Sequence, residues 1–269
     1  MRQGCAGITE TCDRISAIPV LRQGRYEVRL ARSADDLALA LRLRALSFRE
    51  GTRAGTSDGL DFDAFDAWCQ HLLVCDLASG ALVCCFRLMA LTDGSSIHRT
   101  YSAQFYNLRA LASYPHPMLE LGRFCLHPES HDPDILRLAW AAVARIVDET
   151  RAEMLFGCSS FQGTDAGRHA DAFALLKDRH LAPPRWLPRV KAPQVFRFAR
   201  TLASVTPDLT RALRGMPPLL RTYLTMGGWV SDHAVVDRDL NTMHVFTGLE
   251  TSFIPPARAR ALRRLAESS

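Results

Sequence analysis

The 269-residue sequence has almost no lysine. Lys177 and Lys191 are the only two, so arginine supplies nearly all of the 33 basic residues behind the net charge of +5. Arginine makes bidentate contacts with phosphates and carboxylates, and a mildly basic surface suits an acidic partner such as a carrier protein or an anionic lipid. An arginine bias inherited from a GC-rich genome explains the same ratio equally well. We expect no nucleic-acid partner.

Long apolar runs are also missing. Crossing a bilayer takes about 20 apolar residues, and the longest candidate here, Ala81 to Leu91, is interrupted by Arg87. The start, Met1 to Pro19, carries acids and arginines and has no apolar stretch of the kind that a secretion signal needs. The sequence therefore predicts a cytoplasmic protein that at most touches the inner membrane at its surface.

Motifs for a metal site or a covalent nucleophile are absent. The eight cysteines contain no CxxC pair, so we interpret them as free, mostly buried thiols and expect no metal site. The nine histidines form no Ser/His/Asp arrangement. Gly157-Cys158-Ser159-Ser160 is not the sharp strand-to-helix turn that presents a nucleophilic serine in hydrolases.

The hydrophobic periodicity mixes strands with helices, which predicts an α/β or α+β sandwich. Period-two segments predict strands at 26–30, 71–77, 81–91, 118–126, 154–161, 195–198, 234–237 and 244–248. Helical spacing predicts helices at 34–49, 104–111, 134–151, 171–179 and 219–226, with a loop at 51–59 and a short helix or ordered turn at 61–70. We divide the chain into a loose N-terminal arm (1–24), a core (25–200) and a C-terminal helix-strand extension packed on the core (201–269).

The apolar strand Met118 to Leu126 contains Glu120 and Arg123. Charges inside an apolar strand are costly unless they are paired or functional. Strict alternation sends these two side chains to opposite faces, whereas a β-bulge at Leu121–Gly122 would bring them to one face and splay the strand from its neighbour. A structural ion pair at a sheet edge is the alternative.

Other charges fit the same picture. Arg87 is the only charge in its apolar strand, so it faces either a polar site or a solvated edge. In the stretch 61–66, acids alternate with aromatics, and Asp63 and Asp66 share a face that suits a cationic substrate, or is simply solvated. Arg44 and Phe48 lie four residues apart on the first helix.

Taken in order, these residues resemble the acyl-homoserine-lactone synthase branch of the GNAT acyltransferase fold. The segment Leu119 to Glu129 and the tail from Met216 to Thr242 resemble more closely the ornithine acyl-carrier-protein N-acyltransferases. The resemblance covers about residues 25–250. It implies a GNAT-like mixed central sheet with a splayed, bulged strand, flanked by helices.

The resemblance also implies an activity: transfer of a (3-hydroxy)acyl group from acyl carrier protein to the α-amino group of L-ornithine, giving lyso-ornithine lipid. Glu120 and Arg123 are the implied catalytic residues. Glu120 would take the amine proton after burial raises its pKa, and Arg123 would orient Glu120 or hold the ornithine carboxylate. The implied substrate-binding residues are Arg44, Phe48, Asp63, Asp66, Arg87 and Phe124, with Phe86 and Phe156 as further lining of an acyl slot.

The turn after this strand separates the chain from enzymes that use coenzyme A. Those enzymes hold the pyrophosphate on the backbone N–H groups of a glycine-rich turn. Here the turn from His127 to Pro133 has no glycine, two prolines and several acids. We therefore expect no bound cofactor, with the acyl donor arriving on the phosphopantetheine arm of acyl carrier protein. Two alternatives stay open: an acyl-homoserine-lactone synthase that uses S-adenosylmethionine, and a non-catalytic module that binds acyl carrier protein or lipid.

Overall fold

The computed structural model describes residues 15, 19–49 and 59–267, which form two compact units. Unit 1 contains residues up to 92, 117–153 and the chain from 255 on; unit 2 contains 93–116 and 154–254. The predicted boundary near residue 200 does not separate the two units. The last helix of the predicted extension belongs to unit 1, and residues 201–254 of the extension belong to unit 2. Among the helices of the described residues, none combines the length and the apolar content that a bilayer crossing requires.

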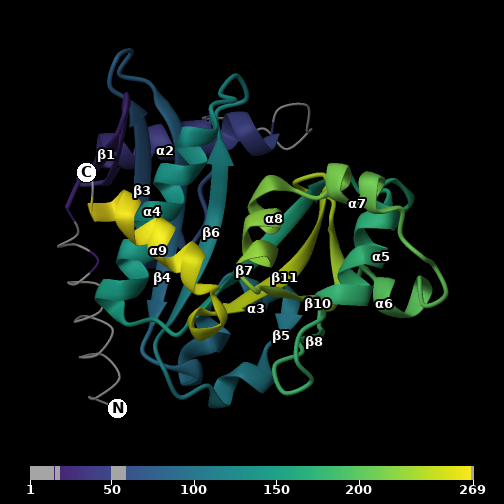
Figure 1. The fold of residues 1–269 in the computed structure, drawn as a ribbon. Helices are drawn as coiled ribbons and strands as arrows, with labels where there is room; N and C mark the ends of the chain where they lie inside the picture. The colour runs from purple at the N-terminus through teal and green to yellow at the C-terminus, as the bar shows by residue number, and fades with distance from the viewer. Residues whose placement is uncertain (1–14, 16–18, 50–58, 268–269) are drawn as a thin grey trace. The chain divides into compact units, whose positions relative to one another are not determined.

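Unit 1 is an antiparallel sheet in the order β1-β2-β3-β4-β6 (Figure 1). Its strands are β1 (Leu21–Gln23), β2 (Tyr26–Leu30), β3 (Gln70–Asp76), β4 (Leu82–Leu91) and β6 (Met118–Leu126). β1 corrects the prediction of a loose arm over 1–24, because Leu21 and Gln23 pair with β2. Residues 1–14 and 16–18 of that arm lie outside the described residues.

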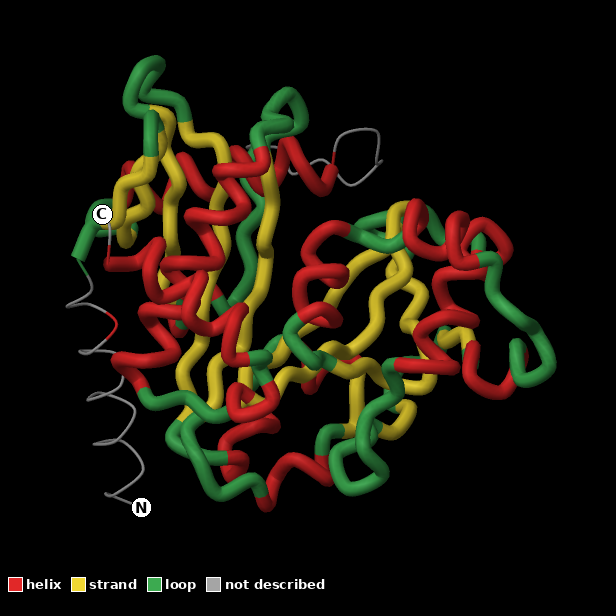
Figure 2. The backbone as a smooth tube through the Cα atoms, in the orientation of Figure 1, coloured by secondary structure: helices red, strands yellow, loops and turns green. Residues whose placement is uncertain are grey.

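Helices α2 (Ala34–Arg49) and α4 (Pro133–Thr150) cover opposite faces of this sheet, and α9 (Pro256–Glu267) packs on α4 (Figures 1 and 2). α2 begins where predicted, since the Ser33 hydroxyl accepts a hydrogen bond from the Asp36 N–H. The predicted helix or turn at 61–70 is a turn that leads into the short 3-10 helix η1 (Asp66–Trp68). Most of the predicted loop at 51–59 lies outside the described residues.

Unit 2 contains the antiparallel strand order β7-β11-β10-β9 and a small second sheet, β5-β8. The strands are β7 (Met154–Gln162), β11 (Thr242–Glu250), β10 (Trp229–Asp237), β9 (Val195–Phe196), β5 (Tyr106–Asn107) and β8 (Arg189–Val190). The helices are α3 (Ser102–Phe105), α5 (Ala170–Arg179), α6 (Phe198–Thr201), α7 (Leu209–Gly215) and α8 (Pro218–Thr225). Four 3-10 helices complete it: η2 (Gly94–Arg99), η3 (Arg109–Ser113), η4 (Ala166–His169) and η5 (Thr251–Phe253).

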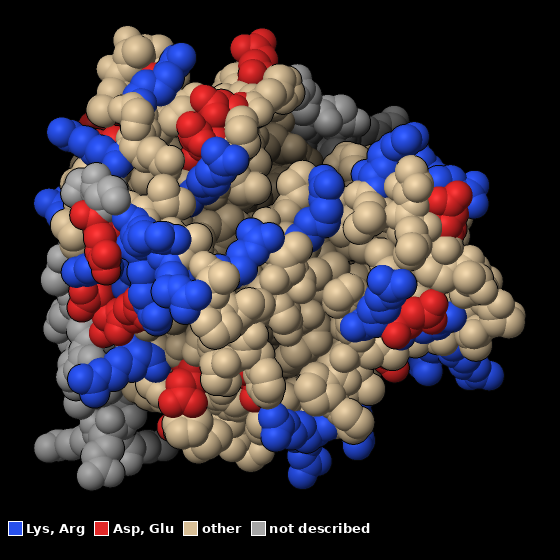
Figure 3. Space-filling model, in the orientation of Figure 1, with Lys and Arg blue, Asp and Glu red and all other residues tan. Residues whose placement is uncertain are grey.

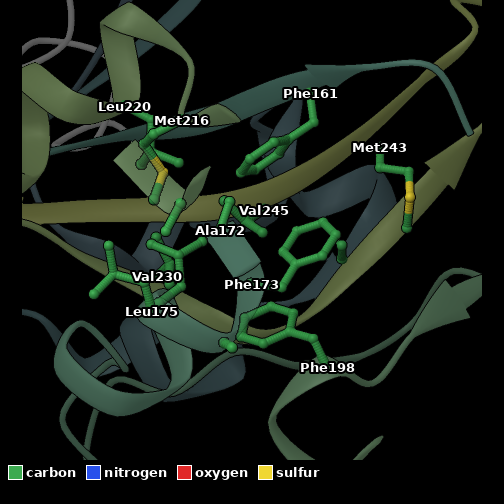
Figure 4. Packing of buried hydrophobic residues seen from close by; sticks show 14 of the residues in the cluster. Phe161, Ala172, Phe173, Leu175, Phe198, Met216, Leu220, Val230, Met243 and Val245 are labelled. Atoms are coloured by element: carbon green, nitrogen blue, oxygen red, sulfur yellow. The ribbon is translucent and has the colours of Figure 1, made fainter. Parts of the chain in front are cut away.

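An apolar cluster forms the core of unit 2. Figure 4 shows Phe161, Phe173 and Phe198 converging from β7, α5 and α6. The Phe173 ring stacks on Phe198 at 5.2 Å between centroids and lies 4.8 Å from Phe161. All three side chains are almost completely buried. Close packing of this kind contributes stability through both burial and ring contacts.

The prediction of one helix over 104–111 is wrong. The segment is the end of α3, then β5, then the start of η3. Tyr106 explains the break: its hydroxyl donates to the backbone oxygen of His244 at 2.7 Å, and the side chain is buried. Tertiary contacts therefore override the local helical spacing. The predicted strand 195–198 is also shorter, because α6 begins at Phe198.

Candidate active site

A β-bulge in β6 shapes the charged face of unit 1. Arg87 pairs with Gly122 and Cys85 pairs with Cys125, so three steps along β6 stand opposite two along β4. Arg123 lies at the extra position with φ of 51°, the left-handed region that a residue with a side chain rarely adopts. The bulge therefore falls one or two residues beyond the predicted Leu121–Gly122.

The bulge brings Glu120 and Arg123 to one face of the sheet, which confirms the central prediction about this strand. Glu120 pairs with Met89, and Met89 shares a face with Arg87, two residues away. Arg123 reaches the same face, because its guanidinium contacts Asp63 at 3.0 Å and Arg87 contacts the same carboxylate at 2.6 Å. The backbone of a regular strand would have placed Arg123 on the opposite face.

Three aspartates and three arginines from distant parts of unit 1 form one ionic network. Arg44 of α2 contacts Asp61 at 3.0 Å and Asp66 at 2.7 Å. Arg87 of β4 forms two hydrogen bonds to Asp63 and also contacts Asp66. Arg44, Asp61, Asp66 and Arg87 are each less than 5% exposed. Charges buried to this degree are stable only when they are paired.

Arg123 completes the network from β6. Its guanidinium lies 3.4 Å from Asp61 and 3.0 Å from Asp63. Burial opposes ionisation of Asp63, but the hydrogen bonds and charge of Arg87, with the charge of Arg123, outweigh it and lower the pKa of Asp63 to about 2. Asp63 is therefore ionised, and both Asp63 and Asp66 are already bonded to arginines. This arrangement does not favour the predicted binding of a cationic substrate by these two carboxylates.

The turn that carries the aspartates is held by its own hydrogen bonds. The Asp63 N–H donates to the Asp66 carboxylate, and the Asp63 carboxylate accepts from the Phe65 N–H, both at 2.9 Å. His71 of β3 donates from Nε2 to the backbone oxygen of Asp66 at 3.2 Å. Burial lowers the pKa of His71. The neutral imidazole of His71 therefore stabilises the aspartate turn through this hydrogen bond.

Sequence reasoning missed three residues of this site. Asp61 was recognised only as part of an acidic stretch, yet it is fully buried between two arginines. His71 carried no signal beyond its place at the start of a strand. Cys69 lies close enough to Arg87 and Glu120 to sense their charges, and burial raises the pKa of its thiol to about 12. The thiol is thus protonated and is not a nucleophile.

The aromatic residues of the predicted site separate onto two faces. The Arg123 guanidinium lies 6.0 Å from the centre of the Phe48 ring, so Phe48 borders the charged face. Phe124 stacks on Phe86 at 5.2 Å. Phe86 precedes Arg87 in β4, so this pair lies on the opposite face of the sheet. Phe156 belongs to unit 2, where it stacks on Phe246 at 5.8 Å.

In the turn between β6 and α4, a side chain of the turn itself caps the N-terminus of α4. The Asp132 carboxylate accepts from the Asp134 N–H at 2.9 Å, and Tyr26 donates to the same carboxylate at 2.9 Å. Pro133 at the first helical turn has no N–H to offer. A negative charge thus occupies the place where a helix would otherwise bind phosphate. Within the described ranges, no group of three or more His, Cys, Asp and Glu side chains is placed to hold a metal ion.

The chain is similar to several known proteins. Residues 43–141 match the acetyltransferase (GNAT) domain family. The L-ornithine N(alpha)-acyltransferase of Rhodobacter capsulatus is 34% identical over 236 residues, covering 84% of this chain and 90% of the relative. That of Brucella abortus is 33% identical, covering 86% of each chain. Among solved structures, an N-acyl amino acid synthase from uncultured soil microbes, FeeM, aligns over 92% of this chain and 100% of its own at 10% identity, with a TM-score of 0.48.

These relatives and the GNAT match agree with the α/β fold, with helices on both faces of a sheet, that the sequence predicts. Extensive coverage at more than 30% identity assigns the family directly. The chain is an acyltransferase and belongs to the L-ornithine N(alpha)-acyltransferase family.

Proposed function

We propose that this protein transfers a (3-hydroxy)acyl group from acyl carrier protein to the α-amino group of L-ornithine, producing lyso-ornithine lipid. Membership of the family supports the acceptor and the reaction. The observation that carries the mechanism is the β6 bulge, which gathers Glu120 and Arg123 on one face beside a balanced ionic network.

The reaction is attack of an amine on a thioester. The α-amino nitrogen forms a bond to the carbonyl carbon, the carbon–sulfur bond breaks, and the pantetheine sulfur leaves and receives a proton. The attacking nitrogen must first be neutral. Glu120, buried in β6, takes the proton, either directly or through a water. Backbone N–H groups at the bulge, where the ladder of β4 and β6 is interrupted, stabilise the oxyanion.

Charge complementarity favours ornithine on this face. Three guanidinium groups stand against three aspartates, and Glu120 adds a fourth carboxylate. Ornithine carries two ammonium groups and one carboxylate, and this face offers groups of both signs. Two of the aspartates act through Arg123: Asp61 and Asp63 hold its guanidinium on the face of the sheet that Glu120 shares. In this role Asp63, Asp66 and Arg87 are positioning residues.

The turn before α4 supports a carrier-protein donor over coenzyme A. Asp132 already caps the helix N-terminus, and its charge would repel a pyrophosphate. A phosphopantetheine arm attached to a carrier protein has no pyrophosphate to place there. The site therefore needs no bound cofactor.

Exposed arginines on α9 support contact with an acidic partner. Figure 3 shows basic side chains gathered over this helix, which carries Arg258, Arg260, Arg263 and Arg264, all exposed. Acyl carrier protein and the anionic surface of the inner membrane both have the charge that this face would attract. We propose that the protein makes peripheral contact with the cytoplasmic face of the inner membrane, where a lipid product would be released.

Replacing the base tests the mechanism. Glu120→Gln removes the proton acceptor with little change in volume, so we expect kcat to fall by about 10²- to 10⁴-fold. The assay is mass spectrometry of N-acylornithine made from hydroxyacyl carrier protein and L-ornithine. Asp134→Asn, at the partly exposed start of α4, is the control. Full activity of a folded Glu120→Gln enzyme would remove Glu120 from the base role.

Competing substrates test the donor and the acceptor. We expect kcat/KM to be at least about 100-fold higher with the acyl group on carrier protein than on coenzyme A, because a lost charge-assisted phosphate site costs several kcal/mol. Labelled ornithine should enter the lipid product, and labelled S-adenosylmethionine should not. Equal use of the coenzyme A thioester would refute the donor, and a labelled homoserine lactone would refute the acceptor.

A further inference from the structure

Unit 2 contains a pocket of about 450 Å³ that shares no residue with the ionic network of unit 1. Its walls come from η2, α3, β5, η3 and β8, around the small sheet in which β5 and β8 lie side by side (Figure 1). Ile97, Tyr106 and Leu108 supply buried apolar surface. The Tyr106 hydroxyl is bonded to the backbone of His244, so the pocket meets mainly the ring. The volume lies in the range of small-molecule sites.

The polar residues of this pocket are basic or neutral. His98, Arg109 and Lys191 line it, and no aspartate or glutamate does. Within residues 19–49 and 59–267, neither Arg109 nor Lys191 forms an ion pair with a carboxylate. Both side chains are exposed at the rim. The pocket thus presents two cations beside an apolar wall.

Lys177, the only other lysine of the chain, has an ammonium group whose three hydrogen-bond donors all have partners. Lys177 donates from Nζ to three backbone oxygens, those of Leu202, Ala203 and Val205. Lys191 donates to one, that of Ala103, at 2.6 Å. An ammonium group has three donors. Lys191 is therefore anchored at the pocket and retains donors for a ligand.

We propose that this pocket binds an anionic amphiphile: an acyl chain that ends in a carboxylate or phosphate. The chain lies against Ile97, Leu108 and Val190, and the head group meets Arg109 and Lys191 at the rim. Bidentate contact with arginine suits both kinds of anion. A free inorganic anion would leave the apolar wall unused, and a neutral lipid would leave the cations unpaired. The inference does not depend on the proposed reaction, because none of its residues belongs to the candidate active site.

Calorimetric titration of the full chain tests this with single-chain probes below their micelle concentrations. We expect decanoate and decyl phosphate to bind, and decylamine and inorganic phosphate to bind at least about tenfold more weakly, since each lacks one of the two recognised parts. Tighter binding of decanoate identifies a fatty carboxylate as the ligand class; tighter binding of decyl phosphate identifies a phospholipid. Equal binding of decylamine, or of phosphate alone, would overturn the proposal.

Two variants locate the site by independent means. Arg109→Gln removes the rim charge, and Ala112→Phe narrows the pocket from η3 without touching a charge. We expect each to weaken decanoate binding about tenfold, with circular dichroism unchanged. Arg200→Gln, an exposed arginine of unit 2 outside the pocket, should bind as the unaltered protein does. Unchanged affinity in Arg109→Gln or in Ala112→Phe would exclude this pocket as the binding site.

Discussion

Both units contain apolar clusters, but they differ in the charged side chains that they bury. Unit 1 buries paired acidic and basic side chains, with Arg44 and Asp66 almost inaccessible to solvent beside the charged face of β6. Unit 2 fills its main cluster with apolar side chains such as Phe161, Phe173 and Phe198 (Figure 4). Buried ion pairs contribute little net stability compared with apolar packing of the same volume. The difference agrees with the proposal that the charges of unit 1 serve chemistry and the core of unit 2 serves stability.

The sharpest way to break this comparison is to remove one partner of the buried network. Arg44→Met leaves Asp61 and Asp66 buried without it, so we expect the free energy of unfolding to fall by about 3–5 kcal/mol. Urea denaturation measures the loss. Arg137→Met, which breaks an exposed pair with Asp134, should change stability by less than about 1 kcal/mol. A loss below about 1 kcal/mol for Arg44→Met would show that the network is not effectively buried.

A change in the apolar core should affect stability and leave chemistry alone. Phe173→Leu removes the ring contacts with Phe161 and Phe198, and we expect a loss of about 2 kcal/mol. The kcat of the folded enzyme should stay within about twofold of the unaltered value, since a residue outside the site adds no transition-state contact. A tenfold fall in kcat with folding intact would contradict the division of labour between the units.

Acid should weaken unit 1 through His71. Burial lowers the folded-state pKa of His71 below its unfolded value of about 6.5. In that window the unfolded chain binds more protons, so stability falls as the pH drops below about 6.5, by at most about 1.4 kcal/mol per pH unit for this one group. His71→Gln should flatten the curve of unfolding free energy between pH 7.5 and 5.5. An unaltered slope in the variant would assign the acid sensitivity to another group.

The smallest effect is expected at Asn241 of unit 2, which has the same left-handed backbone conformation as Arg123. Asn241 lies between β10 and β11 with φ of 48°, and asparagine tolerates this region well. Asn241→Gly should therefore change stability by less than about 0.5 kcal/mol. Thermal denaturation checks this. A gain above about 1 kcal/mol would mean that Asn241 is strained.

Strong periodicity made most elements of the fold predictable. The bounds of β6 were predicted correctly, and those of α4 to within one residue, because their apolar patterns are long and bounded by proline. The helix predicted at 104–111 failed because buried Tyr106 bonds to a strand far along the chain. Such non-local contacts leave no trace in local spacing.

The sequence predicted that several charged side chains would gather on one face, but it did not predict how they pair. Glu120, Arg123, Arg87 and the acidic turn lie on one face as expected, but the sequence cannot show which aspartate meets which arginine. The bulge was predicted at Leu121–Gly122, yet the left-handed residue is Arg123. Ion pairs hold that conformation from 60 residues away in sequence, at Asp63. The splay of β6 from its neighbour and the roles of the individual residues stay predictions.

The bulge gives β6 one residue more than the stretch of β4 that it pairs with. Each residue added to or removed from a strand exchanges its two sides beyond that point. Deleting Phe124 would let β4 and β6 pair without interruption, at the cost of the stacking of Phe124 on Phe86. It would also turn the guanidinium of Arg123 away from Asp63 and toward the Phe86 side. A single extra residue in β6 thus decides whether Glu120 and Arg123 share one face of the sheet or lie on opposite faces.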